Sequence, residues 1–136
     1  MGTLRVIGGS AKGLRLKTVP GDTTRPITDL VKEALFNILG DEVLGNKVLD
    51  VFGGTGAVGI EALSRGAESA LFLDKSREAV RIIQENLRAT HLNDKAEVQH
   101  QDAFIFLAQA ASSAYDLIYI APPQYKGMWQ KALDLL

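Results

Sequence analysis

The stretch "KVLDVFGGTGAVG", residues 47–59, decides the fold. Its first part, 47–52, is an apolar run typical of a buried strand, and a helix is predicted to follow over 57–65. The glycines from Gly54 to Gly59 have the G-x-G-x-x-G spacing of a nucleotide-binding loop, where glycine allows positive φ and close approach of a ligand to the backbone. Strand, glycine loop and helix in this order predict the first unit of an α/β domain.

Strands and helices alternate along the rest of the chain. Further strands are predicted at 70–73, 96–100 and 115–120, and helices at 76–90, 103–111 and 128–136. Four strands joined by helical crossovers predict a parallel sheet covered on both faces, a Rossmann-like, doubly wound α/β fold. We expect one domain over residues 1–136, with an N-terminal hairpin and loop at 1–25 and the core at 26–136.

A helix is also predicted before the first sheet strand, ending at Gly40. Its apolar positions follow the i, i+3, i+4, i+7, i+8 pattern of a buried face. These positions are Val31, Ala34, Leu35, Ile38 and Leu39.

The N-terminal segment is basic. Residues 3–18 are expected to form two short strands around a glycine-rich turn, and residues 1–20 contain no acid. Such a hairpin could bind nucleic-acid phosphates, or its charges could merely prevent edge-to-edge pairing of strands. The candidates for such phosphate contacts are Arg5, Lys12, Arg15, Lys17 and Arg25.

Composition excludes several classes of protein. The chain is 46% hydrophobic and 23% charged with a net charge of −1, an ordinary globular balance. It has no cysteine, so only His91 and His100 could offer imidazole to a metal, and we expect both to be surface or satisfied histidines without a metal. No apolar run reaches the length of a membrane span, and the start lacks a signal peptide, so we expect a soluble cytoplasmic protein.

The acids at the strand ends indicate which ligand the glycine loop takes. Asp74 ends the second strand, where a carboxylate can accept both ribose hydroxyls. Asp50 would face the pyrophosphate of NAD unfavourably but suits the ammonium and sulfonium of S-adenosylmethionine. Asp102 could meet the adenine amino group or simply cap a helix. The alternative is that the glycines serve only packing. The predicted cofactor residues are Asp50, Gly53, Gly54, Thr55, Gly56, Asp74, Lys75, Asp102 and Ala103.

The stretch "IAPPQYKG", residues 120–127, leaves the fourth strand through two prolines. Neither proline can donate to a ladder, so the chain forms a stiff tip. Ligands of open α/β sheets bind beyond the carboxyl ends of the strands, which would place this tip beside the glycine loop. The predicted catalytic tip consists of Ala121, Pro122, Pro123, Gln124 and Tyr125.

Four stretches resemble the RsmD-like family of small-subunit ribosomal RNA guanine-N2 methyltransferases. They are "RVIGGSAKGLRLKT" (5–18), "TRPITDLVKEALFNIL" (24–39), "VLDVFGGTGAVGIEALSRGA" (48–67) and "LFLDKSREAV" (71–80). The resemblance implies methyl transfer from S-adenosylmethionine to a guanine amine, with ribosomal RNA or the small ribosomal subunit as partner. Which guanine is modified and the oligomeric state stay open.

The sequence departs from the family pattern at two places. The family's fourth motif reads Asp-Pro-Pro-Tyr, whereas this chain has Ala121 in place of the acid, and Gln124 and Tyr125 could take over acceptance and stacking. The chain also ends after the fourth core strand and its helix, which suggests a truncated methyltransferase fold or an edge supplied by a partner. These departures favour one alternative, a weak or inactive RNA-binding relative. A second alternative, an NAD-dependent oxidoreductase, is favoured only by the glycine spacing and disfavoured by Asp50 and the two prolines.

Overall fold

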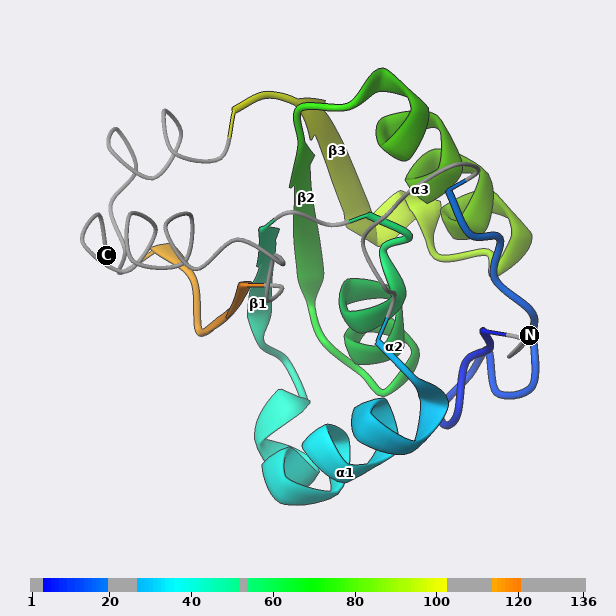
Figure 1. The fold of residues 1–136 in the computed structure, drawn as a ribbon. Helices are drawn as coiled ribbons and strands as arrows, with labels where there is room; N and C mark the ends of the chain where they lie inside the picture. The colour runs from blue at the N-terminus through cyan, green and yellow to red at the C-terminus, as the bar shows by residue number, and fades with distance from the viewer. Residues whose placement is uncertain (1–3, 20–26, 52–53, 103–113, 121–136) are drawn as a thin grey trace.

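The computed structural model describes residues 4–19, 27–51, 54–102 and 114–120. Four parallel strands form one sheet in the order β3-β2-β1-β4 (Figure 1). The strands are β1 (Lys47–Val51), β2 (Ser69–Asp74), β3 (Ala96–His100) and β4 (Leu117–Ile120). The helices are α1 (Asp29–Leu39), η1 (Gly40–Val43), α2 (Ala57–Ser64), α3 (Arg77–Ala89) and η2 (Asn93–Lys95).

Local signals in the sequence account for the helix ends. Ser76 caps α3 by accepting a hydrogen bond from the Ala79 N–H, and Thr28 caps α1 in the same way. Gly40 and Gly66 follow α1 and α2 with positive φ, as expected of glycines at helix ends. The predicted alternation of strands and helices is therefore confirmed wherever the structure describes it, and the predicted helices over 103–111 and 128–136 lie outside the described residues.

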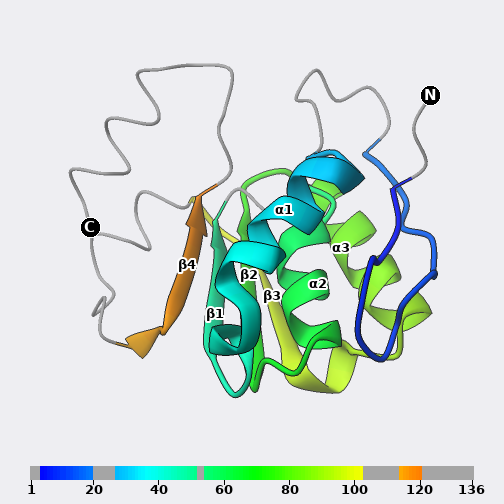
Figure 2. The ribbon, with the colours of Figure 1, turned by 90° about the horizontal axis from the view of Figure 1, so that it is seen from below.

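Both faces of the sheet are buried. On one face, Val48, Ala70 and Phe72 belong to the main hydrophobic core with residues of α2 and α3. Because side chains alternate along a strand, Leu49 and Val51 point to the opposite face, and they too are almost fully buried. In Figure 2, α2 and α3 lie on the same face of the sheet, as right-handed crossovers that run in one direction along a sheet require. The predicted parallel sheet, buried on both sides, is confirmed.

The predicted buried face of α1 is wrong. Val31 and Ile38 are 55% and 83% exposed, whereas Lys32 and Phe36 are the buried residues of this helix. The Lys32 ammonium reaches buried acceptors that the local pattern does not reveal. The face that packs inward therefore runs through Lys32 and Phe36. Leu35 and Leu39 are only partly buried against the core.

The N-terminal segment, residues 4–19, is called the arm below. It folds back on itself through an antiparallel bridge between Arg5 and Arg15, with Val6 N–H bonded to the Leu14 carbonyl at 2.9 Å. The predicted hairpin therefore forms, with an isolated bridge in place of two regular strands. In Figures 1 and 2 the arm (blue) lies on the α2 and α3 side of the molecule, away from β4.

Candidate functional site

The predicted site residues lie at the carboxyl ends of the strands, along one edge of the sheet. The chain runs outward from β1 to β2 and β3 and then crosses back to β4, so the strand order reverses between β1 and β4. Ligands of doubly wound sheets bind at this reversal. Asp50, Asp74 and Asp102 lie in or just after β1, β2 and β3 at this edge.

The glycine loop adopts the left-handed conformations that its sequence predicts. Gly54 has φ 57° and Gly56, the N-cap of α2, has φ 79°. The third glycine has a different role: a Cβ at Gly59 would lie 2.3 Å from a ring carbon of Phe72, so Gly59 is required for packing of α2 on β2. The packing explanation thus holds for the last glycine, while positive φ accounts for the first two.

Asp74 holds the loop to the end of β2. Its Oδ2 accepts the Gly54 N–H at 3.1 Å, and its Oδ1 accepts the Ser76 N–H at 2.9 Å. Each carboxylate oxygen has two lone pairs, so both oxygens can still accept a ligand hydroxyl. Asp74 is half-buried and sits where a ligand resting on the glycine loop would meet it.

Asp50 is a buried carboxylate with incomplete hydrogen bonding. It is 1% exposed, and its Oδ2 accepts the Gly59 N–H at 3.0 Å. Its Oδ1 has no hydrogen-bond partner among the residues that the structure describes. Burial, opposed by the Gly59 bond and assisted by the charge of Asp74, raises the pKa of Asp50 to about 7. A buried acid with a vacant oxygen lone pair suits a cationic ligand group at this edge.

Tyr119 borders the same carboxylate. It is the β4 residue in register with Asp50, and burial together with the charge of Asp50 raises its pKa to about 12. Tyr119 therefore remains a neutral phenol over the physiological range. Its ring and that of Phe72, which pairs with Asp50 from β2, give the carboxylate apolar neighbours on both sides.

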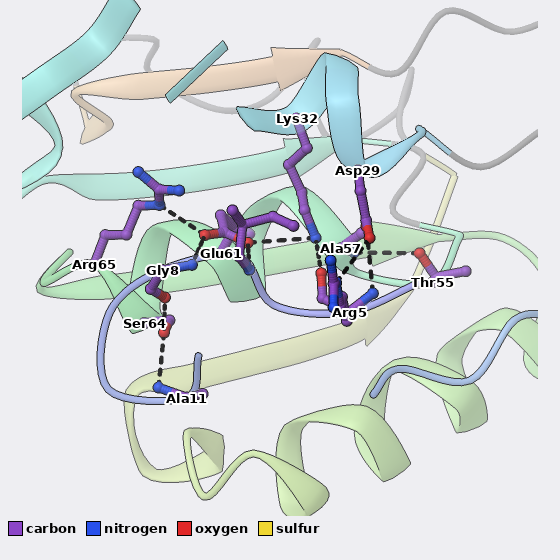
Figure 3. Close-up of polar contacts among 12 residues, drawn as sticks. Arg5, Gly8, Ala11, Asp29, Lys32, Thr55, Ala57, Glu61, Ser64 and Arg65 are labelled. Atoms are coloured by element: carbon purple, nitrogen blue, oxygen red, sulfur yellow. Dashed lines mark hydrogen bonds and ion pairs between the residues drawn. The ribbon is translucent and has the colours of Figure 1, made fainter. Parts of the chain in front are cut away.

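The arm is attached to the core by buried polar contacts (Figure 3). Glu61 of α2 is fully buried, and its carboxylate accepts the N–H groups of Ile7 and Gly8, each at 2.9 Å. Lys32 Nζ lies 3.3 Å from the same carboxylate and donates to the Arg5 carbonyl at 2.5 Å. The arm backbone is thus bonded directly to both partners of a buried ion pair.

Comparison with known proteins identifies the family. The family model described as "Conserved hypothetical protein 95" matches residues 4–136. The chain belongs to this family. It is 44% identical to the Bacillus subtilis protein named "Putative rRNA methyltransferase YlbH" over 132 residues, covering 96% of this chain and 71% of that protein. It is 36% identical to "Ribosomal RNA small subunit methyltransferase D" of Escherichia coli strain K12, covering 99% and 67% respectively.

A solved structure agrees with the sequence matches. The structure of "Putative methyltransferase yhhF from Escherichia coli" superposes with a TM-score of 0.84 at 36% identity, covering 99% of this chain and 72% of that one. The predicted membership of the RsmD-like methyltransferase family and the predicted fold are therefore confirmed.

The structure brings together some of the predicted site residues of this family member. Asp74 bonds Gly54 in the loop and lies close enough to Asp50 for its charge to raise the pKa of that acid, while Asp50 bonds Gly59 in α2. Thr55 and Gly56 complete the loop, and Thr55 is buried. Lys75 is exposed, its carbonyl 2.8 Å from His100 Nε2, and Asp102 is half-buried. Among the predicted RNA-binding residues, Arg5 pairs with Asp29 and Lys17 with Glu85, whereas Lys12 and Arg15 are exposed. Gly53, Ala103, Arg25 and the tip at 121–125 lie outside the described residues.

Sequence reasoning missed Asn86. Its side chain is 1% exposed and bonds both the arm and the glycine loop. A polar residue within an apolar helical pattern could have revealed it, since Asn86 follows Ile82 and Ile83 at the spacing of the buried face of α3. Within the described part of the chain there is no cluster of metal-binding side chains, and no helix is long and apolar enough to cross a membrane.

Proposed function

We propose that this protein transfers a methyl group from S-adenosylmethionine to the exocyclic N2 amine of a guanine in small-subunit ribosomal RNA. The observation that carries the proposal is the unsatisfied Oδ1 of buried Asp50 beside the glycine loop. Ionising this acid inside the protein is unfavourable unless a positive group binds, and S-adenosylmethionine has an ammonium and a sulfonium. Relatives named as ribosomal RNA methyltransferases support the substrate class.

The residues at the strand ends fit this cofactor. Asp50 would meet a cationic part, the loop at Gly54 and Gly56 would allow close approach of the ligand to the backbone, and Asp74 would accept the ribose hydroxyls. Asp102 would meet the adenine amino group. When bound, S-adenosylmethionine supplies an electrophilic methyl group on its sulfonium.

The tip at 121–125 is proposed to position the guanine. The N2 lone pair is delocalised into the ring, so the amine needs acceptors that hold its N–H groups and direct the lone pair towards the methyl carbon. Ala121 offers only its backbone carbonyl, and Gln124 Oε1 is the proposed side-chain acceptor, with Tyr125 stacking on the base. N2 would form the new bond to the methyl carbon as the bond from that carbon to the cofactor sulfur breaks. The cofactor would leave as the neutral thioether S-adenosylhomocysteine, and N2 would release one proton to solvent. Alignment of this kind can supply about 7 to 11 kcal/mol of a barrier.

A turnover experiment tests this function. The protein is incubated with S-adenosylmethionine carrying a labelled methyl group and with small ribosomal subunits, or their naked RNA, from cells lacking the endogenous enzyme of this family. Digestion of the RNA to nucleosides should give labelled N2-methylguanosine. A different labelled nucleoside would overturn the guanine assignment, and a thermal shift with NAD but not with S-adenosylhomocysteine would overturn the cofactor.

Ala121 favours a second candidate, an RNA-binding relative with little or no activity. Ala121→Asp restores the acid of the family motif and separates the two candidates. If the missing acceptor limits an otherwise intact site, this change should raise the single-turnover rate by about one to two powers of ten, the value of a charge-assisted hydrogen bond. Cofactor binding without turnover in both the parent and Ala121→Asp would favour the binding protein.

The arm is the proposed RNA-binding surface. Lys12 and Arg15 are exposed and form no ion pair within the described residues, so they are free to meet phosphates, whereas Lys17 is shared with Glu85. Lys12→Glu with Arg15→Glu should weaken RNA binding and reduce the slope of log affinity against log salt by about 0.7 to 0.9 for each phosphate that is no longer neutralised. An unchanged slope would leave these charges with only an edge-blocking role.

A further inference from the structure

Asn86 is bonded to two segments that are far apart in sequence. Its Oδ1 accepts the Lys17 N–H at 2.7 Å, and its Nδ2 donates to the Lys17 carbonyl at 3.0 Å. The same Nδ2 donates to the Thr55 carbonyl at 2.9 Å. One buried amide thus pairs with both backbone groups of an arm residue, as a neighbouring strand would, and also with the backbone of the glycine loop.

The bond to Thr55 is one of three side-chain hydrogen bonds that hold the glycine loop, with the Gly54 N–H on Asp74 and the Ala57 N–H on Thr55 Oγ1. Thr55 lies between Gly54 and Gly56, both of which have positive φ, and glycine on each side leaves the loop few steric restraints of its own. A peptide group is planar and trans, so the Thr55 carbonyl and the Gly56 N–H point in opposite directions. Because the carbonyl points to Asn86 in α3, the Gly56 N–H is directed away from α3.

The arm end of this link is firmly held. Ser64 Oγ donates to the Gly8 carbonyl at 2.6 Å and accepts the Ala11 N–H at 2.9 Å, and Leu16 N–H bonds the Leu4 carbonyl at 2.8 Å. The arm is therefore secured on α2 at its turn and on α3 at Lys17. A displacement of the arm would pull on Asn86, and Asn86 cannot move without releasing the Thr55 carbonyl.

We propose that Asn86 is a positioning residue that couples the seating of the arm on α3 to the shape of the glycine loop, so that cofactor affinity depends on the arm. The inference rests on the proposed cofactor role of the loop. Coupling between sites is reciprocal, so cofactor bound at the loop would in turn strengthen the seated, RNA-binding state of the arm. The enzyme would then bind RNA best when its methyl donor is in place.

A double-mutant cycle tests the coupling, with the dissociation constant of S-adenosylhomocysteine measured calorimetrically and without RNA. Lys17→Pro removes the N–H that Asn86 accepts, at a residue whose hydrogen bonds within the described part of the chain go to Asn86 and Glu85 and not to the loop. It should weaken binding by at least about fivefold, the low end of coupling between sites. Asn86→Ala should weaken it by a similar factor, and adding Lys17→Pro to Asn86→Ala should then have almost no further effect.

Two controls separate coupling from general destabilisation. Thr18→Pro places a proline at the next position, where the N–H has no partner among the described residues, and should leave binding unchanged. Thr90→Val removes a buried hydroxyl that donates to the Asn86 carbonyl within α3, and should lower stability without changing affinity. If Lys17→Pro does not fold, Ser64→Ala, which releases the other end of the arm, replaces it in the cycle.

The outcomes also distinguish this inference from the proposed function. Additive effects of Lys17→Pro and Asn86→Ala, or equal effects of Lys17→Pro and Thr18→Pro, in a protein that binds S-adenosylhomocysteine normally would overturn the coupling alone. Failure of the unmutated protein to bind S-adenosylhomocysteine would overturn the cofactor proposal and the coupling together. Loss of affinity confined to Lys17→Pro and Asn86→Ala, and non-additive in the pair, would establish Asn86 as the link.

Discussion

Two buried carboxylates lie at α2, and their surroundings differ: Glu61 is part of the helix, and Asp50 of β1 bonds the Gly59 N–H of the helix. Glu61 accepts two backbone N–H groups and forms ion pairs with Lys32 and Arg65, so its charge is met entirely by this chain. Asp50 accepts one backbone N–H, and its other oxygen has no partner among the described residues. The two acids are equally buried, so what distinguishes the structural acid from the site acid is the number of partners. Glu61 has four partners within this chain, whereas one oxygen of Asp50 has none among the described residues.

Removing the charge of Glu61 should have the largest effect on stability. Glu61→Gln leaves the buried Lys32 ammonium without its counter-charge and weakens the attachment of the arm, and breaking a buried pair from one side costs about 3 to 5 kcal/mol. Urea denaturation measures the loss. The double variant Glu61→Gln with Lys32→Met removes both charges and should recover much of it. A cost below about 1 kcal/mol for Glu61→Gln would remove the distinction between the two acids.

The corresponding change at Asp50 should act in the opposite direction. The pKa of Asp50 is raised from 3.8 to about 7, so the unfolded chain loses this proton first and stability falls as pH rises between these values. Asp50→Asn should therefore stabilise the protein at pH 8, by up to about 4 kcal/mol at about 1.36 kcal/mol per pKa unit, while abolishing cofactor binding. Denaturation at pH 8 and pH 4 measures both limits, and the gain should vanish at pH 4. A destabilised Asp50→Asn would mean that the carboxylate is satisfied after all.

Cofactor binding should reveal the same ionisation. A cationic ligand group favours the carboxylate form of Asp50, so affinity for S-adenosylhomocysteine should be full above the raised pKa near 7. Below it, affinity should fall by up to about tenfold, or about 1.4 kcal/mol, for each pH unit as Asp50 takes up a proton. Calorimetry at several pH values gives the profile. Glu61→Gln is the matched control: loosening the arm should lower affinity at every pH, and the dependence of affinity on pH should stay as in the unmutated protein. A flat profile in the unmutated protein would place the cationic group elsewhere.

An exposed ion pair of the arm should matter least. Arg5 Nε lies 3.3 Å from Asp29 Oδ2, and the two side chains are 60% and 28% exposed. Surface pairs contribute at most about 1 kcal/mol, so Arg5→Gln should change the free energy of unfolding by less than that. Thermal unfolding of Arg5→Gln, measured together with Glu61→Gln, checks this difference in stability. An effect as large as that of Glu61→Gln would show that the arm is held at its surface as much as through its buried contacts.

Some features of the fold could be predicted because their causes are local. The glycine loop, Ser76 at the start of α3 and Gly40 after α1 act on the residues next to them, so each is visible in a short window of sequence. Asp50 and Asp74 could be placed at a common edge because parallel strands all end on the same side. The tip at 121–125 and its missing acid were also evident from the sequence, and their role stays a prediction.

The misassigned face of α1 shows where such reasoning ends. Its apolar stripe through Val31 and Ile38 satisfies helical periodicity, yet these side chains are exposed and Lys32 is buried. The partner of Lys32 is Glu61 in another helix, far from α1 in the sequence. The helical periodicity of α1 depends only on residues within α1, so it cannot predict this contact. Burial lowers the pKa of Lys32, and the negative charge of Glu61 opposes that shift. The effect of Glu61 on this pKa comes from the same contact.

The sequence by itself determined the α/β class, the family, and the strand ends at which a cofactor would bind, because these depend on short patterns and on the direction of parallel strands. Only the tertiary structure decided which buried polar groups are completed by the chain and which are left for a ligand. Asn86 and Glu61 acquire their roles from backbone groups of an arm that is remote in sequence, Lys17 and Ile7 among them. Hydrogen bonding and desolvation depend on distances in space, and those exist only once the chain has folded.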